Sequence, residues 1–304
     1  IVQVGITGSS GFLGTALAAH LRGQGHDVVR FVRRTATEPD ERSWSGTDLA
    51  PDALAGLDAH VHLSGAGVGE KRWSPAYREV IRRSRVETTA AVARAVAGAG
   101  TPVLLSGSAI GFYGDRGAEE LDETSGPGEG FLAEVCVEWE AATAPARGST
   151  RLALLRTGVV IGSSNGERDP LLQRLVPLVK GFLGAPVGNG RQYLSWVALE
   201  DWLRAVEHLL TGSVEGPVNL VSPAPVTNTE LMKALGAALH RPTMPLGVPG
   251  PLVRLVAAFG ATHIGQDDRR ARRVPGFGRD LAIARDVLRC LGPFVLHHHQ
   301  QPDT

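Results

Sequence analysis

A glycine-rich segment near the start of the chain, GITGSSGFLG at residues 5–14, restricts the fold more than any other stretch. The apolar run IVQVGI at residues 1–6 predicts a buried strand, and residues 12–23 carry leucines and alanines at helical spacing. Strand, glycine turn and helix in this order predict the first βα unit of a nucleotide-binding α/β fold.

Three glycines in this turn have separate expected roles. Gly8 permits a tight turn off the strand, Gly11 lets the backbone approach a pyrophosphate, and Gly14 lets the helix pack closely. A pyrophosphate would then meet free N–H groups at the positive end of the helix dipole. The alternative is a glycine-rich turn that only connects two elements.

The spacing Thr7-Gly-x-x-Gly-x-x-Gly14 resembles the extended short-chain dehydrogenase/reductase superfamily. That superfamily includes sugar-nucleotide epimerases, dehydratases and related reductases. Two-domain dehydrogenases differ, because they have one residue fewer between the first two glycines.

Apolar strands and helices alternate along the first half of the chain. We expect strands at 27–32, 58–63, 103–106 and from 151, and a long helix at about 76–97. This alternation predicts an α/β fold, a Rossmann-type doubly wound parallel sheet. We assign residues 1–164 to a dinucleotide-binding Rossmann domain. Residues 165–304 form a mixed region, of which part returns to the sheet and part is a smaller α+β cap over the substrate.

The pattern loosens after about residue 165. We expect a helix interrupted by Pro177, a strand at about 191–199, an amphipathic helix from Leu199, and a helix that starts near Thr227 or Thr229.

Two arginines follow the second expected strand, where this architecture faces the adenosine ribose. Arg33 and Arg34 stand there with no acid beside them, and guanidinium groups can grip a 2′-phosphate bidentately. The alternative is a solvated charge pair at a strand end. With the glycine turn, this favours NADP(H) as the cofactor. The candidate cofactor residues are Gly8, Ser9, Ser10, Gly11, Phe12, Leu13, Gly14, Arg33, Arg34, Leu63, Ser64, Gly65, Ala66 and Ser106.

Further motifs extend the resemblance to about residues 4–245. They include residues 71–73, 84–89, 108–115, 139–140, 156–160, 188–196 and 219–225. Together they are similar to the epimerase-like or cell-division-inhibitor-like branch, whose C-terminal part is a domain of unknown function. The resemblance implies the Rossmann fold, an NADP-type cofactor and a small polar or nucleotide-linked substrate.

The superfamily's usual Tyr-x-x-x-Lys pair, in which the tyrosine moves a proton, is missing. Tyr77, Tyr113 and Tyr193 have no lysine four residues later. By position, Phe131 replaces the tyrosine and Val135 the lysine, and neither side chain can move a proton. We expect both to face the nicotinamide.

Ser108 matches the superfamily serine that hydrogen-bonds the substrate, and Tyr113 is a substitute acid; both are candidate catalytic residues. Backbone bonding of the serine and packing of the tyrosine ring are the alternatives. Candidate substrate contacts are Arg72, Trp73, Arg156, Gln192 and Trp196. The alternative for these is that the tryptophans are core and the arginines pair with surface acids.

The composition of the chain limits the kinds of partner that we expect. The formal net charge is zero, which gives no indication of a nucleic acid or an acidic membrane surface as partner. No apolar run reaches membrane-spanning length. Cys136 and Cys290 are too few for a disulfide framework, which fits a cytoplasmic protein. We expect no metal site, and read His297–His299 as a frayed tail. The oligomeric state stays open.

The leading hypothesis is an NADPH-dependent oxidoreductase or epimerase-like enzyme. One rival is a catalytically silent NADPH-binding sensor or regulator, which the lost tyrosine and lysine favour. A true sugar-nucleotide epimerase is a second rival, against which the same loss counts.

Overall fold

A parallel sheet of seven strands forms the centre of the computed structural model, which describes residues 1–164, 166–244 and 270–271. The strand order is β13-β7-β5-β4-β1-β2-β3, and every neighbouring pair is parallel. This confirms the expected Rossmann-type sheet. The strands are β1 (Gln3–Thr7), β2 (Asp27–Val32), β3 (Glu41–Ser43), β4 (Ala59–His62), β5 (Val103–Ala109), β7 (Arg151–Thr157) and β13 (Gly216–Leu220).

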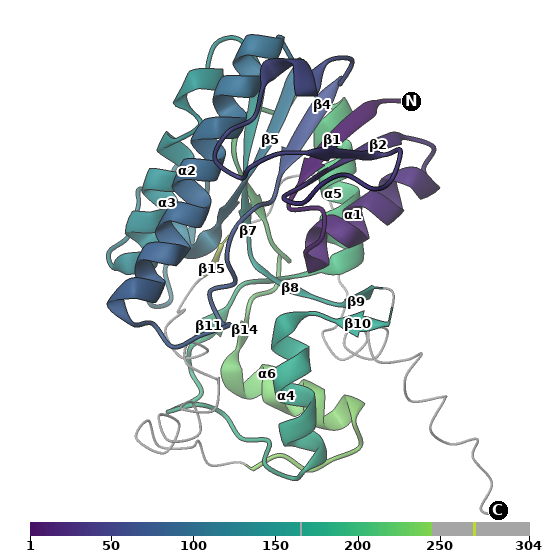
Figure 1. The fold of residues 1–304 in the computed structure, drawn as a ribbon. Coiled ribbons are helices and arrows are strands. Elements are labelled where there is room, and N and C mark those ends of the chain that lie inside the picture. Colours follow the sequence, from purple (N-terminus) through teal and green to yellow (C-terminus); the bar gives the residue numbers. More distant parts are fainter. Residues whose placement is uncertain (165, 245–269, 272–304) are drawn as a thin grey trace, which may run out of the picture.

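Helices cover both faces of the sheet (Figure 1). On one face, α1 (Phe12–Gly23) and α5 (Leu199–Thr211) bury leucines and Trp202 against the strands. On the other face lie α2 (Pro75–Ala99) and α3 (Phe131–Ala141). Short 3₁₀ turns at Pro51–Leu54, Ile110–Tyr113 and Ala144–Ala146 complete this layer.

Local sequence explains the ends of α2. The Ser74 hydroxyl caps the helix by accepting the Tyr77 N–H at 3.2 Å, and Pro75 stands at the first helical position. Gly100 ends the helix in the left-handed conformation, at φ 68°, where a side chain would be strained. These signals place the ends of α2 within two residues of the sequence prediction.

A smaller layer lies at the carboxyl ends of the strands. There α4 (Pro170–Lys180) and α6 (Asn228–Ala238) pack around Trp196, and α6 begins at Thr227 with a capping box. The guanidinium of Arg174 on α4 donates to the Gly69 carbonyl in the loop that follows β4. This contact places α4 beside the carboxyl end of the sheet.

Two local expectations in this layer were wrong. Helix α4 runs through Pro177, because its buried apolar face offsets the one hydrogen bond that proline removes. The strand expected at about 191–199 divides into two, because β11 pairs with β14 whereas β12 pairs with β8. The small strands are β6 (Glu120–Leu121), β8 (Val159–Ile161), β9 (Ser163–Ser164), β10 (Glu167–Arg168), β11 (Tyr193–Leu194), β12 (Trp196–Ala198), β14 (Val226–Thr227) and β15 (Arg270–Ala271).

The arginine-rich stretch from Gly260, Cys290 and His297–His299 lie outside the described residues, apart from β15. The division of the chain at residue 164 stays a prediction. Strand β13 and helix α5, which pack in the sheet layer, come from residues after 164.

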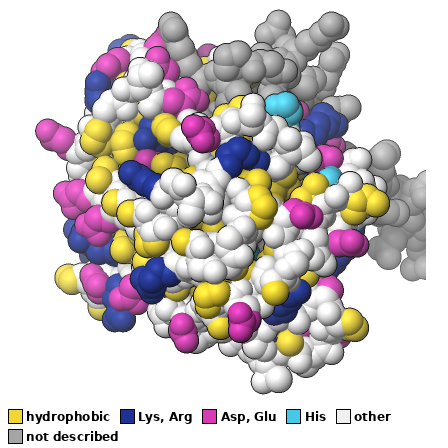
Figure 2. All heavy atoms as spheres, turned by 90° about the horizontal axis from the view of Figure 1, so that it is seen from above, with side chains coloured by type: hydrophobic (Ala, Val, Ile, Leu, Met, Phe, Trp, Pro, Cys, Tyr) yellow, Lys and Arg dark blue, Asp and Glu magenta, His cyan; other side chains and the backbone are white. Residues whose placement is uncertain are grey.

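Acidic and basic side chains alternate over the face in Figure 2, without a broad field of one sign. Among the described helices, none is both long and apolar enough to cross a membrane.

Candidate cofactor cleft

The glycine turn between β1 and α1 has the backbone that phosphate binding requires. Gly8 has φ 76°, and a side chain there would collide with the Leu63 backbone. A methyl group on Gly14 would overlap the Gly8 carbonyl oxygen. Gly11 differs, because its φ of −81° suits any residue and an added Cβ would meet only the Gly8 oxygen, at 3.4 Å. Neither strain nor packing explains glycine at position 11, so the space in front of it is open for a ligand.

This turn forms one wall of a cavity of about 1220 Å³. Opposite walls come from the ends of β2 and β4, the loop that follows β3, and one face of α2. Of the candidate cofactor residues, those that line the cavity are Gly8, Ser9, Ser10, Gly11, Arg33, Arg34, Leu63, Ser64, Gly65 and Ala66. Phe12 and Leu13 instead pack against the core, and Gly14 and Ser106 are buried away from the cavity.

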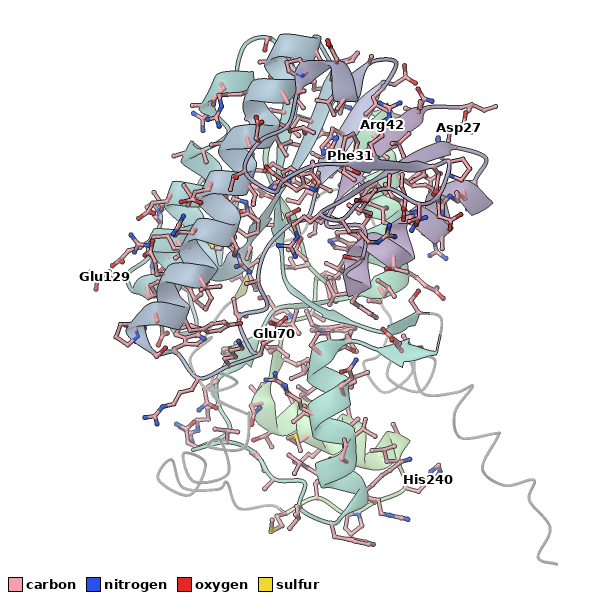
Figure 3. The ribbon with its side chains drawn as sticks, in the orientation of Figure 1. Asp27, Phe31, Arg42, Glu70, Glu129 and His240 are labelled. Carbon is pink, nitrogen blue, oxygen red and sulfur yellow. The ribbon has the colours of Figure 1, made fainter. Side chains whose placement is uncertain are left out.

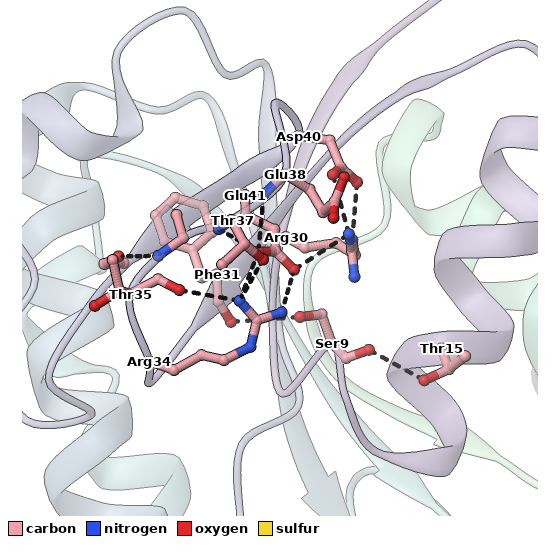
Figure 4. A network of polar contacts seen from close by, with 12 residues as sticks. Ser9, Thr15, Arg30, Phe31, Arg34, Thr35, Thr37, Glu38, Asp40 and Glu41 are labelled. Atoms are coloured by element: carbon pink, nitrogen blue, oxygen red, sulfur yellow. Dashed lines mark hydrogen bonds and ion pairs between the residues drawn. The ribbon is translucent and has the colours of Figure 1, made fainter.

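The two arginines after β2 differ in their contacts, and Figure 4 shows those of Arg34. Arg34 makes two parallel hydrogen bonds to Glu41 on β3, at 2.8 and 2.7 Å. Arg33 is exposed on the cavity wall and has no hydrogen bond or ion pair with any residue that the structure describes. The expectation that no acid stands beside the pair was therefore wrong for Arg34. Of these two arginines, Arg33 is the one whose guanidinium has no partner among the described residues.

Glu41 fastens the loop between β2 and β3. Its buried carboxylate also accepts the Thr37 N–H at 3.0 Å and lies 3.2 Å from the Arg30 guanidinium. The hydrogen bond from Arg34, together with that backbone bond, lowers the pKa of Glu41 to about 2, so it stays charged. The loop is thus held in one shape beside the cavity.

Two histidines lie under the turn. His60 and His62 on β4 are completely buried, and burial lowers the pKa of each to about 3. The Thr7 hydroxyl lies 3.2 Å from Nε2 of His60 and 2.7 Å from Nδ1 of His62. The Thr88 hydroxyl, on a residue of the cavity wall, lies 3.3 Å from the other His62 nitrogen. Both rings are neutral and serve as hydrogen-bonding parts of the core.

A buried polar network holds both candidate catalytic residues. The Ser108 hydroxyl donates to Glu140 at 2.6 Å, and Arg156 makes two bonds to the same carboxylate, at 2.8 and 2.9 Å. Arg156 also donates to the Tyr113 hydroxyl at 3.0 Å, which donates to Asn219 at 2.7 Å. Ser108, Arg156 and Asn219 face one another in register across β5, β7 and β13.

These contacts limit what the two hydroxyls can do. Tyr113 is completely buried, and burial raises its pKa, so it is a poor acid near neutral pH. The Ser108 hydroxyl donates its hydrogen bond to Glu140, so only its lone pairs remain to accept a bond from another group. Neither residue lines the cavity. Their catalytic roles stay predictions.

Phe131 and Val135 pack against α2 near the start of α3. Val135 contacts Tyr77 and Ile81 in a small apolar cluster, and the ring of Phe131 meets Trp73 edge-on at 5.4 Å. Neither side chain lines the cavity. The expectation that they face the nicotinamide stays a prediction.

The candidate substrate residues have separate surroundings, and their role stays a prediction. Trp196 is buried and donates to the Ala224 carbonyl at 2.9 Å, and Arg156 is enclosed in the polar network. Gln192 is half-buried near α6, Trp73 donates to the Val68 carbonyl, and Arg72 is exposed. None of the five lines the cavity.

Several cavity residues were not among the candidate site residues. Trp44, the following Ser45–Thr47 loop and Glu70 carried no motif, and Ser84 and Thr88 belong to the motif at residues 84–89, which gave no role for them. Figure 3 places Glu70 between the sheet and the α4–α6 pair. The helical pattern of α2 predicts that it is amphipathic but not which partner its polar face meets.

Among the described residues, no three His, Cys, Asp or Glu side chains gather closely enough to hold a metal ion.

Comparisons with known proteins agree with this geometry. The model of the NAD dependent epimerase/dehydratase family matches residues 4–221. Epimerase family protein MT2273 of Mycobacterium tuberculosis is 45% identical over 261 residues, 84% of this chain and 84% of that protein. A nucleoside-diphosphate sugar epimerase from Corynebacterium glutamicum shares 33% identity with a TM-score of 0.67, over 98% of this chain and 68% of that one.

The crystal structure of human epimerase family protein SDR39U1 (isoform 2) with NADPH superimposes with a TM-score of 0.77 at 26% identity, over 95% of this chain and 99% of that one. These matches confirm the resemblance drawn from Thr7–Gly14. The chain belongs to the NAD dependent epimerase/dehydratase family.

Proposed function

We propose that the protein is an NADPH-dependent oxidoreductase or epimerase-like enzyme that acts on a small polar or nucleotide-linked substrate. The observation that carries the proposal is the pairing, in one cavity, of the open glycine turn at Gly11 with the unpaired guanidinium of Arg33. The similarity to human SDR39U1, crystallised with NADPH, supports the cofactor.

The residues of the cavity fit that cofactor part by part. The free N–H groups at the start of α1 and the open space at Gly11 suit a pyrophosphate. The Ser9 hydroxyl donates to the Phe31 carbonyl at 3.3 Å, which ties the turn to the end of β2. Arg33, two residues further on, is placed to meet a 2′-phosphate. Arg34 acts by holding the loop through Glu41.

Comparing two single variants tests these separate roles. Arg33→Ala is expected to weaken NADPH binding about tenfold to a hundredfold and leave NADH binding unchanged, because one charge-assisted contact is worth about 1.5–3 kcal/mol. Arg34→Ala is expected to weaken both cofactors together and lower the melting temperature, because it releases the loop. Titration calorimetry on each protein measures this. Equal NADPH affinity in Arg33→Ala and the parent would refute the assignment.

NADPH, when bound, supplies a hydride to an electrophilic carbon of the substrate. The proton that completes a reduction must then come from water or from the substrate, with Ser108 orienting it as an acceptor. Phe131 and Val135 cannot supply that proton, and Tyr113 holds its own tightly. Turnover is therefore expected to be slow, or limited to substrates that need little proton assistance.

The test is loss of NADPH absorbance across a panel of carbonyl compounds and nucleotide sugars. Ser108→Ala is expected to lower kcat with any substrate found. Fast turnover that Ser108→Ala does not change would show that the chemistry lies on other residues. The nucleoside-diphosphate sugar epimerase similarity makes nucleotide sugars the first compounds to try.

A second function, a silent NADPH-binding sensor, is favoured by one observation. Val135 is buried in an apolar cluster with Tyr77 and Ile81 of α2, where a lysine would need polar surroundings. Tight NADPH binding without oxidation by any compound in the panel would select the sensor over the enzyme.

A further inference from the structure

The guanidinium of Arg85 on α2 is half-buried between α2 and α3, and it forms no ion pair with any carboxylate that the structure describes. Its one hydrogen bond to a described residue runs from Nη1 to the Ile81 carbonyl, at 3.1 Å. A guanidinium has five N–H donors, so most of its capacity is unused. Burial lowers the pKa of this group.

Arg85 lies against the inner wall of the cofactor cleft. A Cβ on Gly65, which follows β4 and lines the cleft, would come within 3.3 Å of the Arg85 Cζ. Glycine at this position therefore lets the guanidinium lie directly against the backbone. The preceding residue, Ser84, also lines the cleft and accepts the Ala66 N–H at 2.9 Å. Arg85 thus lies behind the wall that Gly65 and Ser84 form, whereas Arg33 lines the cleft on the β2 side.

A second unsatisfied donor lies beside it. The ring of Trp139 on α3 lies under the Arg85 guanidinium, 5.1 Å from ring centre to Cζ. The side chain of Trp139 is buried, and its indole N–H has no hydrogen-bond partner. A buried donor without an acceptor costs free energy, so the Trp139 indole N–H, next to the unused N–H groups of the half-buried Arg85, indicates a missing acceptor.

Charge decides which kind of acceptor fits. Ribose or substrate hydroxyls would accept hydrogen bonds from the N–H groups but would not pair the positive charge of Arg85, whereas an oxyanion would do both. Val135, which stands at the position of the superfamily lysine, supplies no positive charge to this interface. Val135 contacts Ile81, one helical turn before Arg85.

We propose that Arg85 and the indole N–H of Trp139 form a subsite for an oxyanion, a carboxylate or phosphate group of the substrate. The proposal rests on the proposed function, because Arg85 lies directly behind Gly65 and next to Ser84, two residues that line the cofactor cleft.

The experiment observes Trp139 directly. The chain has five tryptophans, so ¹⁵N-indole labelling gives few resonances, and Trp139→Phe assigns the one of interest. Protein saturated with NADP⁺, which occupies the glycine turn, is titrated with inorganic phosphate and separately with malonate. Both anions are expected to shift the Trp139 indole resonance at millimolar concentration. Arg85→Gln is expected to weaken this response at least tenfold while NADP⁺ affinity changes less than threefold.

Two further variants keep the test decisive. Arg94→Gln makes the same change at an exposed position of α2 and is expected to leave the response intact. Arg85→Lys keeps the charge without the fork, folds more readily than the glutamine variant, and is expected to raise the apparent Kd at least threefold.

No Trp139 shift in the parent protein, or a response in Arg85→Gln as strong as that of the parent, would overturn the subsite. So would a large loss of NADP⁺ affinity in Arg85→Gln with the anion response retained. Failure of the parent protein to bind NADP⁺ at all would instead contradict the proposed function.

Discussion

Acid is expected to unfold this protein through two buried histidines. His60 and His62 have pKa values of about 3 in the folded chain, against an ordinary value of 6.5. Below pH 6.5 the unfolded chain binds two protons that the folded chain does not bind. The contribution of the two histidines to the free energy of unfolding is therefore fully present above this pH and falls as the pH drops toward 3. At 1.36 kcal/mol per pH unit, lowering the pH from 6.5 to 4.5 costs roughly 2.7 kcal/mol for each histidine.

The pair together costs about 5 kcal/mol over this range, a large share of the 5–15 kcal/mol that stabilises a typical folded protein. Urea unfolding followed by tryptophan fluorescence, at steps between pH 7.5 and 4.5, measures the slope. His60→Gln is expected to halve the slope, from about 2.7 to about 1.4 kcal/mol per pH unit, because one titrating group remains. His208→Gln, at an exposed position on α5, is the matched control. A stability that does not change between pH 6.5 and 4.5, or a full slope in His60→Gln, would refute the reasoning.

Three further substitutions test the turn, the loop and the buried network. Gly14→Ala forces a methyl group into the Gly8 carbonyl and should lower both the melting temperature and NADPH affinity, measured by calorimetry, whereas Gly23→Ala on the same helix meets nothing within 4 Å and should be neutral. Glu41→Gln should loosen the β2–β3 loop and weaken NADPH and NADH alike; a change confined to NADPH would show that Glu41 acts on the 2′-phosphate. Arg156→Met leaves the Glu140 carboxylate buried and unpaired and should cost about 3–5 kcal/mol in urea unfolding, so a loss below 1 kcal/mol would show that water already reaches this pair.

Short-range patterns made the fold predictable. The strand–glycine–helix order of residues 1–23 and the cap at Ser74 each act within a few residues, so the sequence displays them directly. The strand pairing in the smaller layer was harder to predict, because β11 and β12 pair with strands that lie far away in the sequence.

The site was only partly predictable, for a related reason. The glycine turn and the Leu63–Ala66 segment line the cavity because strand ends meet at one edge of a parallel sheet. The bond between Arg34 and Glu41 depends on how the β2–β3 loop folds, which no local pattern specifies. Likewise, Ser108 and Arg156 are joined through Glu140, 32 and 16 residues away from them in the chain.

The most direct measurement compares NADPH with NADH on the unmodified protein by titration calorimetry. With Arg33 free and Arg34 held by Glu41, one guanidinium meets the 2′-phosphate, and NADPH should bind about tenfold to a hundredfold more tightly. The preference should shrink as salt concentration rises, because Arg33 is exposed. Equal affinities for the two cofactors, or tighter binding of NADH, would contradict the assignment of this cleft.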